Sequence, residues 1–320
     1  MHYRRLGSAG IKISEISLGA WVTFGNQIEE QIAIDLVHAA YDQGVNFFDN
    51  ADVYAAGRAE SVLGKAIKDM PREALVISSK VFWPTMPGVN GRGLSRKHIM
   101  ESIHTSLKRL NTDYVDIYFC HRFDPDTAVA EVVQTMDILV HQGKVLYWGT
   151  SEWQAAQVVQ AYEYAQRHGL IAPAVEQPQY NLFRRERVEL ELAPLCRQYG
   201  LGLTTFSPLY FGILTGKYNQ GIPAGSRATL DDMGWIKDLL TPENLAKVRK
   251  FSTIAEELGV TSGQLAIAWI LRRKDVSAVL SGATRLEQLD ENLGAAEVVA
   301  QLDEPILERI DEIFALPQNG

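Results

Sequence analysis

Short apolar runs alternate with amphipathic stretches along almost the whole chain. Residues 3–14 contain two such runs with Gly7 and Gly10 flanking a turn between them, and this pattern predicts a β-hairpin. Eight further runs are predicted as strands from their length and apolar character. They span residues 16–18, 45–49, 74–80, 115–120, 147–150, 174–177, 201–206 and 276–281.

Helices are predicted between these runs because apolar residues recur there at a spacing of three and four. Ser95 is a candidate cap for a helix whose Ile99 and Ile103 share one face. Thr261 and Gln264 form a T-x-x-Q capping box before another apolar stretch. Strands and helices are therefore expected to alternate along the chain.

Eight strands interleaved with helices in 320 residues predict an α/β fold, a (β/α)8 TIM barrel whose single domain spans residues 1–320. A doubly wound sheet is the alternative fold. It usually carries G-x-G-x-x-G directly after its first strand, whereas this chain has only the fragments GRG and GLG. In a barrel, the long segments 81–94 and 207–240 would follow strand ends and build the active-site face.

Composition narrows the classes of function. The formal charge of −8 gives no field that would favour nucleic acid or an anionic membrane. The two cysteines, Cys120 and Cys196, lie in apolar surroundings, which indicates reduced thiols and a cytoplasmic protein. The first residues show no apolar secretory segment, and no run reaches the ~18 apolar residues of a membrane span. We therefore expect neither nucleic-acid binding nor direct membrane insertion.

Ionisable side chains close three consecutive predicted strands. Asp49 ends one strand with Tyr54 just beyond it, while Lys80 and His121 end the next two. The carboxyl ends of barrel strands meet at one mouth, so these four residues are predicted to converge there. Each alone has an ordinary explanation: a turn cap, a packed rim tyrosine, a solvated lysine or a core histidine. Their shared position favours a catalytic site.

The four residues together fit the reduction of an aldehyde or ketone. A tyrosine hydroxyl, with a usual pKa of about 10, is a weak proton donor near neutral pH. A neighbouring Lys80 ammonium would stabilise the phenolate and lower that pKa, and a buried lysine needs an anion such as Asp49. His121 would hydrogen-bond the same carbonyl oxygen. Tyr54 would then protonate the oxygen as hydride arrives at the carbon.

Other chemistries lack their motifs. Cys120 and His121 have no second ligand pair at metal spacing, and the chain has no H-E-x-x-H, no G-x-S-x-G and no P-loop, so no metal site is predicted. A barrel aldolase that uses Lys80 as a Schiff base is a further alternative, but Asp49 and Tyr54 fit it less well.

Six stretches spread along the chain carry a family resemblance: GAWVTFGNQI, FFDNADVYAAGRAESVLG, GLSRKHI, YWGTSEW, FSPLYFGILTGKY and SGATRLEQLDENLGA. They resemble the aldo-keto reductase superfamily, closest to the branch of the voltage-gated potassium channel beta subunits and their bacterial relatives. The resemblance implies a barrel whose N-terminal hairpin closes the bottom, and it places the family's catalytic tetrad on Asp49, Tyr54, Lys80 and His121. Channel subunits typically carry asparagine at the histidine position, so this chain resembles ordinary reductases there.

The resemblance also implies a site for NADPH or NADP+. The implied cofactor-binding residues are Trp21, Gln27, Asp49, Ser151, Gln177, Phe206, Ser207, Pro208, Leu209, Gly212, Lys217, Arg227, Gly282, Thr284, Arg285, Gln288, Glu291 and Asn292. Within this set, Ser151 and Gln177 would hold the nicotinamide carboxamide and Phe206 would stack on its ring. Arg285 would meet a ribose 2′-phosphate. Glu152 stands where the channel branch often has arginine.

Sequence and resemblance together predict an NADP-dependent aldo-keto reductase that converts small carbonyl substrates to alcohols, with Tyr54 as proton donor. Trp83, Tyr210 and Phe211 are expected to wall its substrate pocket. The alternative is a potassium channel beta-subunit-like regulatory module that senses the redox state of its cofactor and turns over slowly. A homo-oligomer, tetramer or octamer, follows from the resemblance alone, and no residue supports a channel partner.

Overall fold

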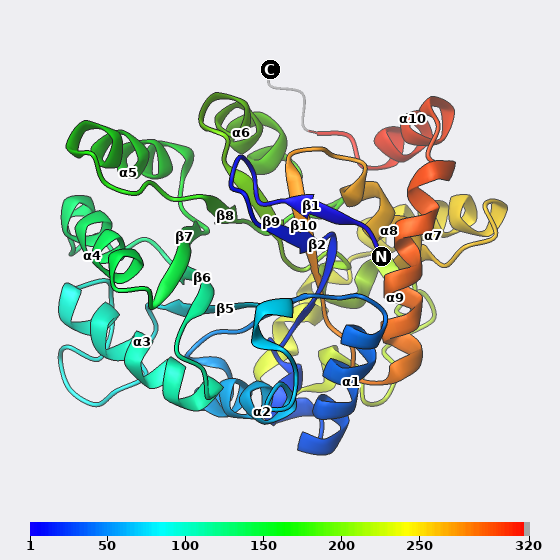
Figure 1. Cartoon of the computed structure of the whole chain (residues 1–320). Helices are drawn as coiled ribbons and strands as arrows, with labels where there is room; N and C mark the ends of the chain where they lie inside the picture. The colour runs from blue at the N-terminus through cyan, green and yellow to red at the C-terminus, as the bar shows by residue number, and fades with distance from the viewer. Residues whose placement is uncertain (317–320) are drawn as a thin grey trace.

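The computed structural model describes residues 1–316, apart from the side chain of residue 232, and its centre is a closed barrel of eight parallel strands (Figure 1). Neighbouring strands follow chain order, and the last strand pairs with the first. The barrel strands are β3 (Ile16–Gly19), β4 (Phe47–Asp49), β5 (Val76–Val81), β6 (Val115–Cys120), β7 (Val145–Ser151), β8 (Val175–Gln177), β9 (Gly202–Thr205) and β10 (Val276–Ser281). All eight predicted strands are present, so the predicted (β/α)8 barrel is confirmed. The last four residues of the predicted domain, 317–320, lie outside the described part.

Helices surround the barrel (Figure 1). They are α1 (Glu30–Asp42), α2 (Arg58–Ala66), α3 (Arg96–Leu110), α4 (Val129–His141), α5 (Ala155–His168), α6 (Ala193–Tyr199), α7 (Pro242–Glu257), α8 (Ser262–Leu271), α9 (Leu286–Val298) and α10 (Glu304–Ile313). The starts of α3 and α8 follow the capping signals in the sequence. Ser95 Oγ accepts a hydrogen bond from the His98 amide at the start of α3, and Thr261 and Gln264 form the predicted capping box of α8. These caps satisfy amides that have no partner within the helix.

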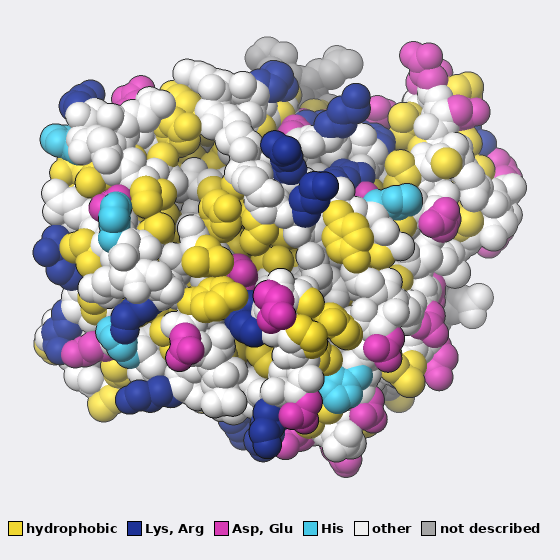
Figure 2. Space-filling model, in the orientation of Figure 1, with side chains coloured by type: hydrophobic (Ala, Val, Ile, Leu, Met, Phe, Trp, Pro, Cys, Tyr) yellow, Lys and Arg dark blue, Asp and Glu magenta, His cyan; other side chains and the backbone are white. Residues whose placement is uncertain are grey.

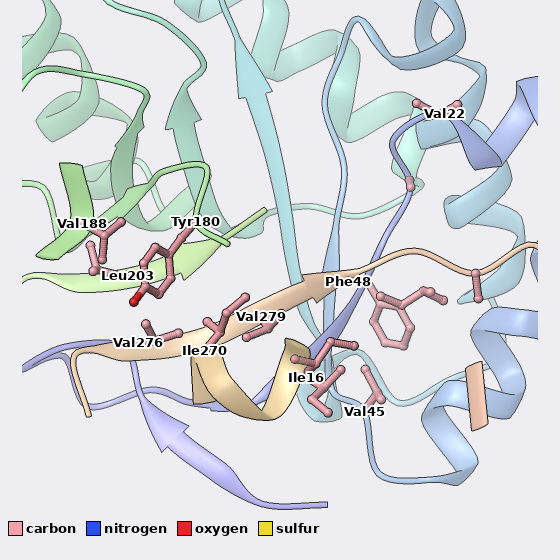
Figure 3. Close-up of a cluster of buried hydrophobic side chains, with 14 of the residues drawn as sticks. Ile16, Val22, Val45, Phe48, Tyr180, Val188, Leu203, Ile270, Val276 and Val279 are labelled. Carbon is pink, nitrogen blue, oxygen red and sulfur yellow. The ribbon is translucent and has the colours of Figure 1, made fainter. Parts of the chain in front are cut away.

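Successive side chains of a strand face alternately into the barrel and out toward the helices. In β4, Phe47 belongs to the apolar cluster of the barrel interior, whereas Phe48 packs outward. Figure 3 shows part of the outer cluster, where Ile270 of α8 lies beside Val276 and Val279 of β10. Each such side chain stabilises the fold by roughly 1.5–3 kcal/mol through burial.

The N-terminal hairpin of β1 (Tyr3–Arg5) and β2 (Lys12–Ser14) closes one end of the barrel, as predicted. Leu6 and Ile13 are fully buried in the interior apolar cluster. Gly7 has φ +56°, and a Cβ there would lie 2.2 Å from the carbonyl oxygen of Gly200, so only glycine permits this approach. Gly200 precedes β9, which places the hairpin at the amino ends of the strands and leaves their carboxyl ends for a site.

No helix within residues 1–316 is long and apolar enough to cross a bilayer. Acidic and basic side chains are mixed over the face shown in Figure 2.

Cys120 is buried and Cys196 is half-buried, and both are free thiols. Burial raises the pKa of Cys196 to about 12, so this thiol is protonated and unreactive near neutral pH.

Candidate active site

The four predicted catalytic residues lie at the carboxyl ends of the strands, directly above the apolar filling of the barrel. Asp49 comes two residues after the interior Phe47, and His121 comes two residues after the interior Phe119. Because strand side chains alternate with a period of two, both polar groups continue the inward-facing rows. Lys80 ends the corresponding row of β5. The strand pattern that fills the core therefore also aims these groups into one place.

Tyr54 reaches the site from a short 3-10 turn, η2 (Tyr54–Gly57), that follows β4. Inside this turn, Ala55 and Ala56 have φ values of +48° and +56°. Left-handed backbone at a non-glycine residue costs on the order of 1–3 kcal/mol and is concentrated at functional sites. The tight turn brings the Tyr54 hydroxyl back to Lys80, whose Nζ lies 3.2 Å away.

Hydrogen bonds link three of the four residues into one buried network. Lys80 Nζ donates to Asp49 Oδ2 at 2.6 Å and to the Tyr54 hydroxyl at 3.2 Å. The other oxygen of Asp49 accepts from Ser78 Oγ at 2.7 Å and from Gln177 Nε2 at 3.1 Å. Lys80 is 0% and Asp49 3% exposed. Such a buried ion pair is tolerable because the carboxylate and the ammonium have these further hydrogen bonds.

Burial of Tyr54 leaves its hydroxyl protonated in the free protein. Burial disfavours the Lys80 ammonium, but Asp49 and Tyr54 outweigh it, so the pKa of Lys80 is raised. Burial also dominates at Tyr54 and raises the pKa of its hydroxyl, although Lys80 acts in the opposite direction. Lys80 lowers the Tyr54 pKa as expected, but burial of the hydroxyl raises it by more.

His121 is a neutral imidazole beside this network. Burial lowers its pKa well below the usual value, and the positive charges of Lys80 and Arg122 lower it further. The rings of Tyr54 and His121 meet edge to face with their centroids 5.9 Å apart. One nitrogen of a neutral imidazole carries a proton and can donate it in a hydrogen bond. The tyrosine and the histidine thus offer two donors side by side.

A cavity of about 1130 Å³ opens over the tetrad at the carboxyl ends of the strands. Sites for small ligands usually measure about 300–1000 Å³, so this cavity has room for a dinucleotide as well as a substrate. Tyr54 and His121 line it, and so does a group of three cations formed by Lys217, Arg227 and Arg285, which we call the cation group. Lys80 lies behind the cavity wall and reaches it through Tyr54.

Every predicted cofactor-binding residue lines this cavity. The lining includes Trp21, Gln27, Asp49, Ser151, Gln177, Phe206, Ser207, Pro208, Leu209, Gly212, Lys217, Arg227, Gly282, Thr284, Arg285, Gln288, Glu291 and Asn292. These residues come from segments that are far apart in the sequence and meet only in the folded barrel. Their placement agrees with the prediction, and their binding roles remain a proposal.

Two of the three predicted substrate-pocket residues line the cavity, Trp83 and Phe211. Tyr210 does not. Its ring is buried and stacks on Phe183, with the centroids 4.8 Å apart. Tyr210 and Phe211 are neighbours in a tight turn where both have positive φ, with their ring centroids 5.5 Å apart, but only Phe211 lines the cavity. The expectation that Tyr210 walls the pocket is therefore wrong.

The chemistry of the lining fits a nicotinamide dinucleotide. The pKa of Lys217 is lowered by burial and then by its neighbours Arg227 and Arg285. Burial also lowers the pKa of Arg227, and no carboxylate in the described part pairs with either Lys217 or Arg227. Mutually repelling cations of this kind suit phosphate groups. Beside the tetrad, Ser151 and Gln177 offer a hydroxyl and an amide to a carboxamide.

Several lining residues carried no prediction. Arg122, Gln179, Met233 and Trp235 all contribute to the wall. Trp235 packs edge to face on Phe211 with the ring centroids 4.7 Å apart. Its segment, 207–240, was predicted to build the active-site face, but nothing in the sequence distinguishes this tryptophan. In the sequence, Arg122 is distinguished only by its position next to His121.

Comparison with known proteins agrees with this geometry. The model of the aldo/keto reductase family matches residues 15–315. The chain belongs to the aldo/keto reductase family. Two relatives, each named "Probable voltage-gated potassium channel subunit beta", come from Arabidopsis thaliana and Oryza sativa subsp. japonica. Both are 48% identical to this chain over 98% of its length and over 97% and 96% of their own.

Membership of the aldo/keto reductase family confirms the resemblance found in the sequence motifs. It supports an oxidoreductase, in a family that generally uses NAD(P)H and acts on small carbonyl compounds. The names of the two relatives refer to potassium channels, and this reference applies to those two proteins.

Proposed function

We propose that this aldo/keto reductase reduces small aldehydes or ketones to alcohols with NADPH, and that Tyr54 donates the proton. The observation that carries the proposal is the buried chain from Asp49 through Lys80 to Tyr54, with neutral His121 beside the tyrosine. A proton donor and a second hydrogen-bond donor then border the same cavity, and the cation that stabilises the conjugate base of the proton donor lies directly behind it.

NADPH, when bound, supplies the hydride. For its nicotinamide end, the fitting residues are Ser151 and Gln177 for the carboxamide and Phe206 for the ring face. For its phosphates, the fitting residues are Lys217 and Arg227, with Arg285 assigned to the ribose 2′-phosphate. Strict preference for NADPH over NADH depends on this last assignment.

The chain's own residues hold the carbonyl and manage the proton. His121 N–H and Tyr54 O–H both donate to the substrate oxygen and orient it. As negative charge develops on that oxygen, Tyr54 transfers its proton and becomes a tyrosinate. Lys80, hydrogen-bonded to the Tyr54 oxygen, stabilises this anion, and Asp49 keeps Lys80 protonated. Lys80 thus stabilises the tyrosinate that forms in this step.

A second candidate function follows from the relatives named as potassium channel beta subunits. In that case the same cavity would hold the cofactor tightly while the protein turned over slowly and served as a redox-sensing module. His121 argues for the reductase, because it adds a donor to the substrate oxygen. Under both candidate functions we propose a single-domain, cytoplasmic homo-oligomer.

The rate of NADPH oxidation with a panel of small aldehydes and ketones separates the two candidates. The reductase requires clear turnover with at least one class of carbonyl compound. Negligible turnover across the panel, combined with tight NADPH binding by titration calorimetry, would favour the module instead.

A further inference from the structure

Arg122 places a positive charge next to the tetrad, in the wall of the same cavity. Its guanidinium carbon lies 5.8 Å from the centroid of the Trp83 ring, and that ring lies 6.3 Å from the His121 ring. The charge is near enough to lower the pKa of His121 and to act in the same direction on Tyr54. Arg122 therefore borders the space where a substrate carbonyl would lie.

The Arg122 guanidinium makes no ion pair with a carboxylate in the described part of the chain. Among the described residues, its one hydrogen bond runs from Nη1 to the carbonyl oxygen of the adjacent His121. Arg122 is half-buried, and burial lowers its pKa. Partial desolvation of a cation without a counter-ion is unfavourable unless a ligand supplies the negative charge.

Glu152 is the carboxylate with the largest influence on Arg122, yet it is engaged elsewhere. Its Oε1 lies 2.9 Å from Arg187 Nη1 and accepts a hydrogen bond from the Gln179 amide at 2.6 Å. Arg187 also pairs with the buried Glu176 at 2.7 Å. This arrangement holds Glu152 in place, so Arg122 keeps free donors toward the cavity.

We propose that Arg122 binds a carboxylate group of the substrate, so that the enzyme prefers carbonyl compounds that carry one negative charge. This inference rests on the proposed reductase function. A guanidinium matches the planar carboxylate with two parallel N–H donors. The nearby Glu152 disfavours a dianion such as a phosphate ester. The formal charge of −8 would repel anions from the molecule as a whole, so any such preference must arise locally.

Matched substrates test the charge without changing the shape. The meta and para isomers of formylbenzoate are compared with the corresponding formylbenzamides, using kcat/KM for NADPH-dependent reduction. We expect the wild type to prefer at least one formylbenzoate over its amide by about tenfold or more, as a charge-assisted hydrogen bond provides. Arg122→Met should abolish this preference, with the amide changing by less than about threefold. Arg122→Lys should retain part of it.

Arg92 provides the matched control. Its guanidinium carbon lies 6.0 Å from the centroid of the same Trp83 ring, but its side chain is exposed and does not line the cavity. Arg92→Met should therefore keep the preference for the acid. Calorimetric binding of the alcohol products, hydroxymethylbenzoate against hydroxymethylbenzamide, to the enzyme with NADP+ should show the same pattern among the variants.

The outcomes separate this inference from the proposed function. Reduction of acid and amide at equal efficiency by the wild type would overturn the inference and leave the reductase intact. An equal loss for both substrates in Arg122→Met would also overturn it, because Arg122 would then act by supporting His121. Absence of any reduction across both series would remove the reductase proposal and this inference with it.

Discussion

The tetrad and the cation group line one cavity but balance their charges in different ways. In the tetrad, the Lys80 ammonium lies 2.6 Å from Asp49, and the pKa of Lys80 is raised. In the cation group, Lys217 and Arg227 have no carboxylate partner in the described part, and their pKa values are lowered. The tetrad pair is buried, whereas Lys217 and Arg285 are exposed and Arg227 is half-buried. The two groups therefore differ in whether the protein itself supplies the counter-ion.

This difference separates a catalytic device from a binding device. The tetrad must keep its protonation states through turnover, and a built-in anion does so whether or not a ligand is present. The cation group is under repulsion until an anion arrives, so part of its electrostatic energy becomes available as binding energy. Removing a charge should therefore destabilise the fold at the tetrad and weaken cofactor binding at the cation group.

Asp49→Asn should have the largest effect on folding. The substitution leaves the Lys80 ammonium buried without its counter-ion, which costs about 3–5 kcal/mol. Urea unfolding measures this loss. The matched control is the double variant Asp49→Asn/Lys80→Met, which removes both charges and should recover much of the stability. A double variant as unstable as the sum of the single changes would show that the ion pair does not act as a unit.

Arg227→Met should weaken cofactor binding without destabilising the fold. Losing a charge-assisted contact of about 1.5–3 kcal/mol should weaken NADPH binding about 10- to 150-fold. The free protein should keep or slightly gain stability, because repulsion with Lys217 is relieved. Titration calorimetry and unfolding of the free protein give the two readouts. Arg309→Met, which removes an exposed arginine paired with Glu257, is the control. A marked loss of stability in Arg227→Met would contradict the contrast between the two groups.

Arg285→Ala should have a smaller and more selective effect. Arg285 is exposed and lies 3.6 Å from Glu287, a weak contact that a 2′-phosphate could replace. We expect NADPH affinity to fall about tenfold while NADH affinity stays the same. Glu287→Gln, which frees Arg285, should keep or increase the preference for NADPH. Equal losses for both cofactors would assign Arg285 to another part of the dinucleotide.

The strands and the tetrad were predictable because they depend on local patterns. Alternation along β4 places both the core residue Phe47 and Asp49, which we propose to be catalytic, so one periodicity predicts packing and site together. The family motifs then indicated the segments that we propose to bind the cofactor, and the residues predicted within them all line the cavity.

Other features depend on how turns and burial arise in three dimensions. Tyr210 and Phe211 lie in a turn with two consecutive positive φ values, and Tyr210 stacks on Phe183 while Phe211 lines the cavity; no sequence pattern encodes this. The direction in which the Tyr54 pKa shifts depends on how deeply the residue is buried, and the spacing of strand ends in the sequence does not predict that burial. The role proposed for Arg122 depends on the ion pair between Glu152 and Arg187, which no local sequence pattern predicts.

Substitution of the proposed proton donor, Tyr54→Phe, tests the central claim most directly. The variant lacks the hydroxyl that lies 3.2 Å from Lys80 Nζ but keeps the ring against His121. Loss of a general acid typically costs about 10²–10⁴-fold in rate, so NADPH oxidation with the best carbonyl substrate should fall by that factor. NADPH affinity by calorimetry should stay within about threefold. Turnover within about threefold of the wild type would contradict the assignment of Tyr54.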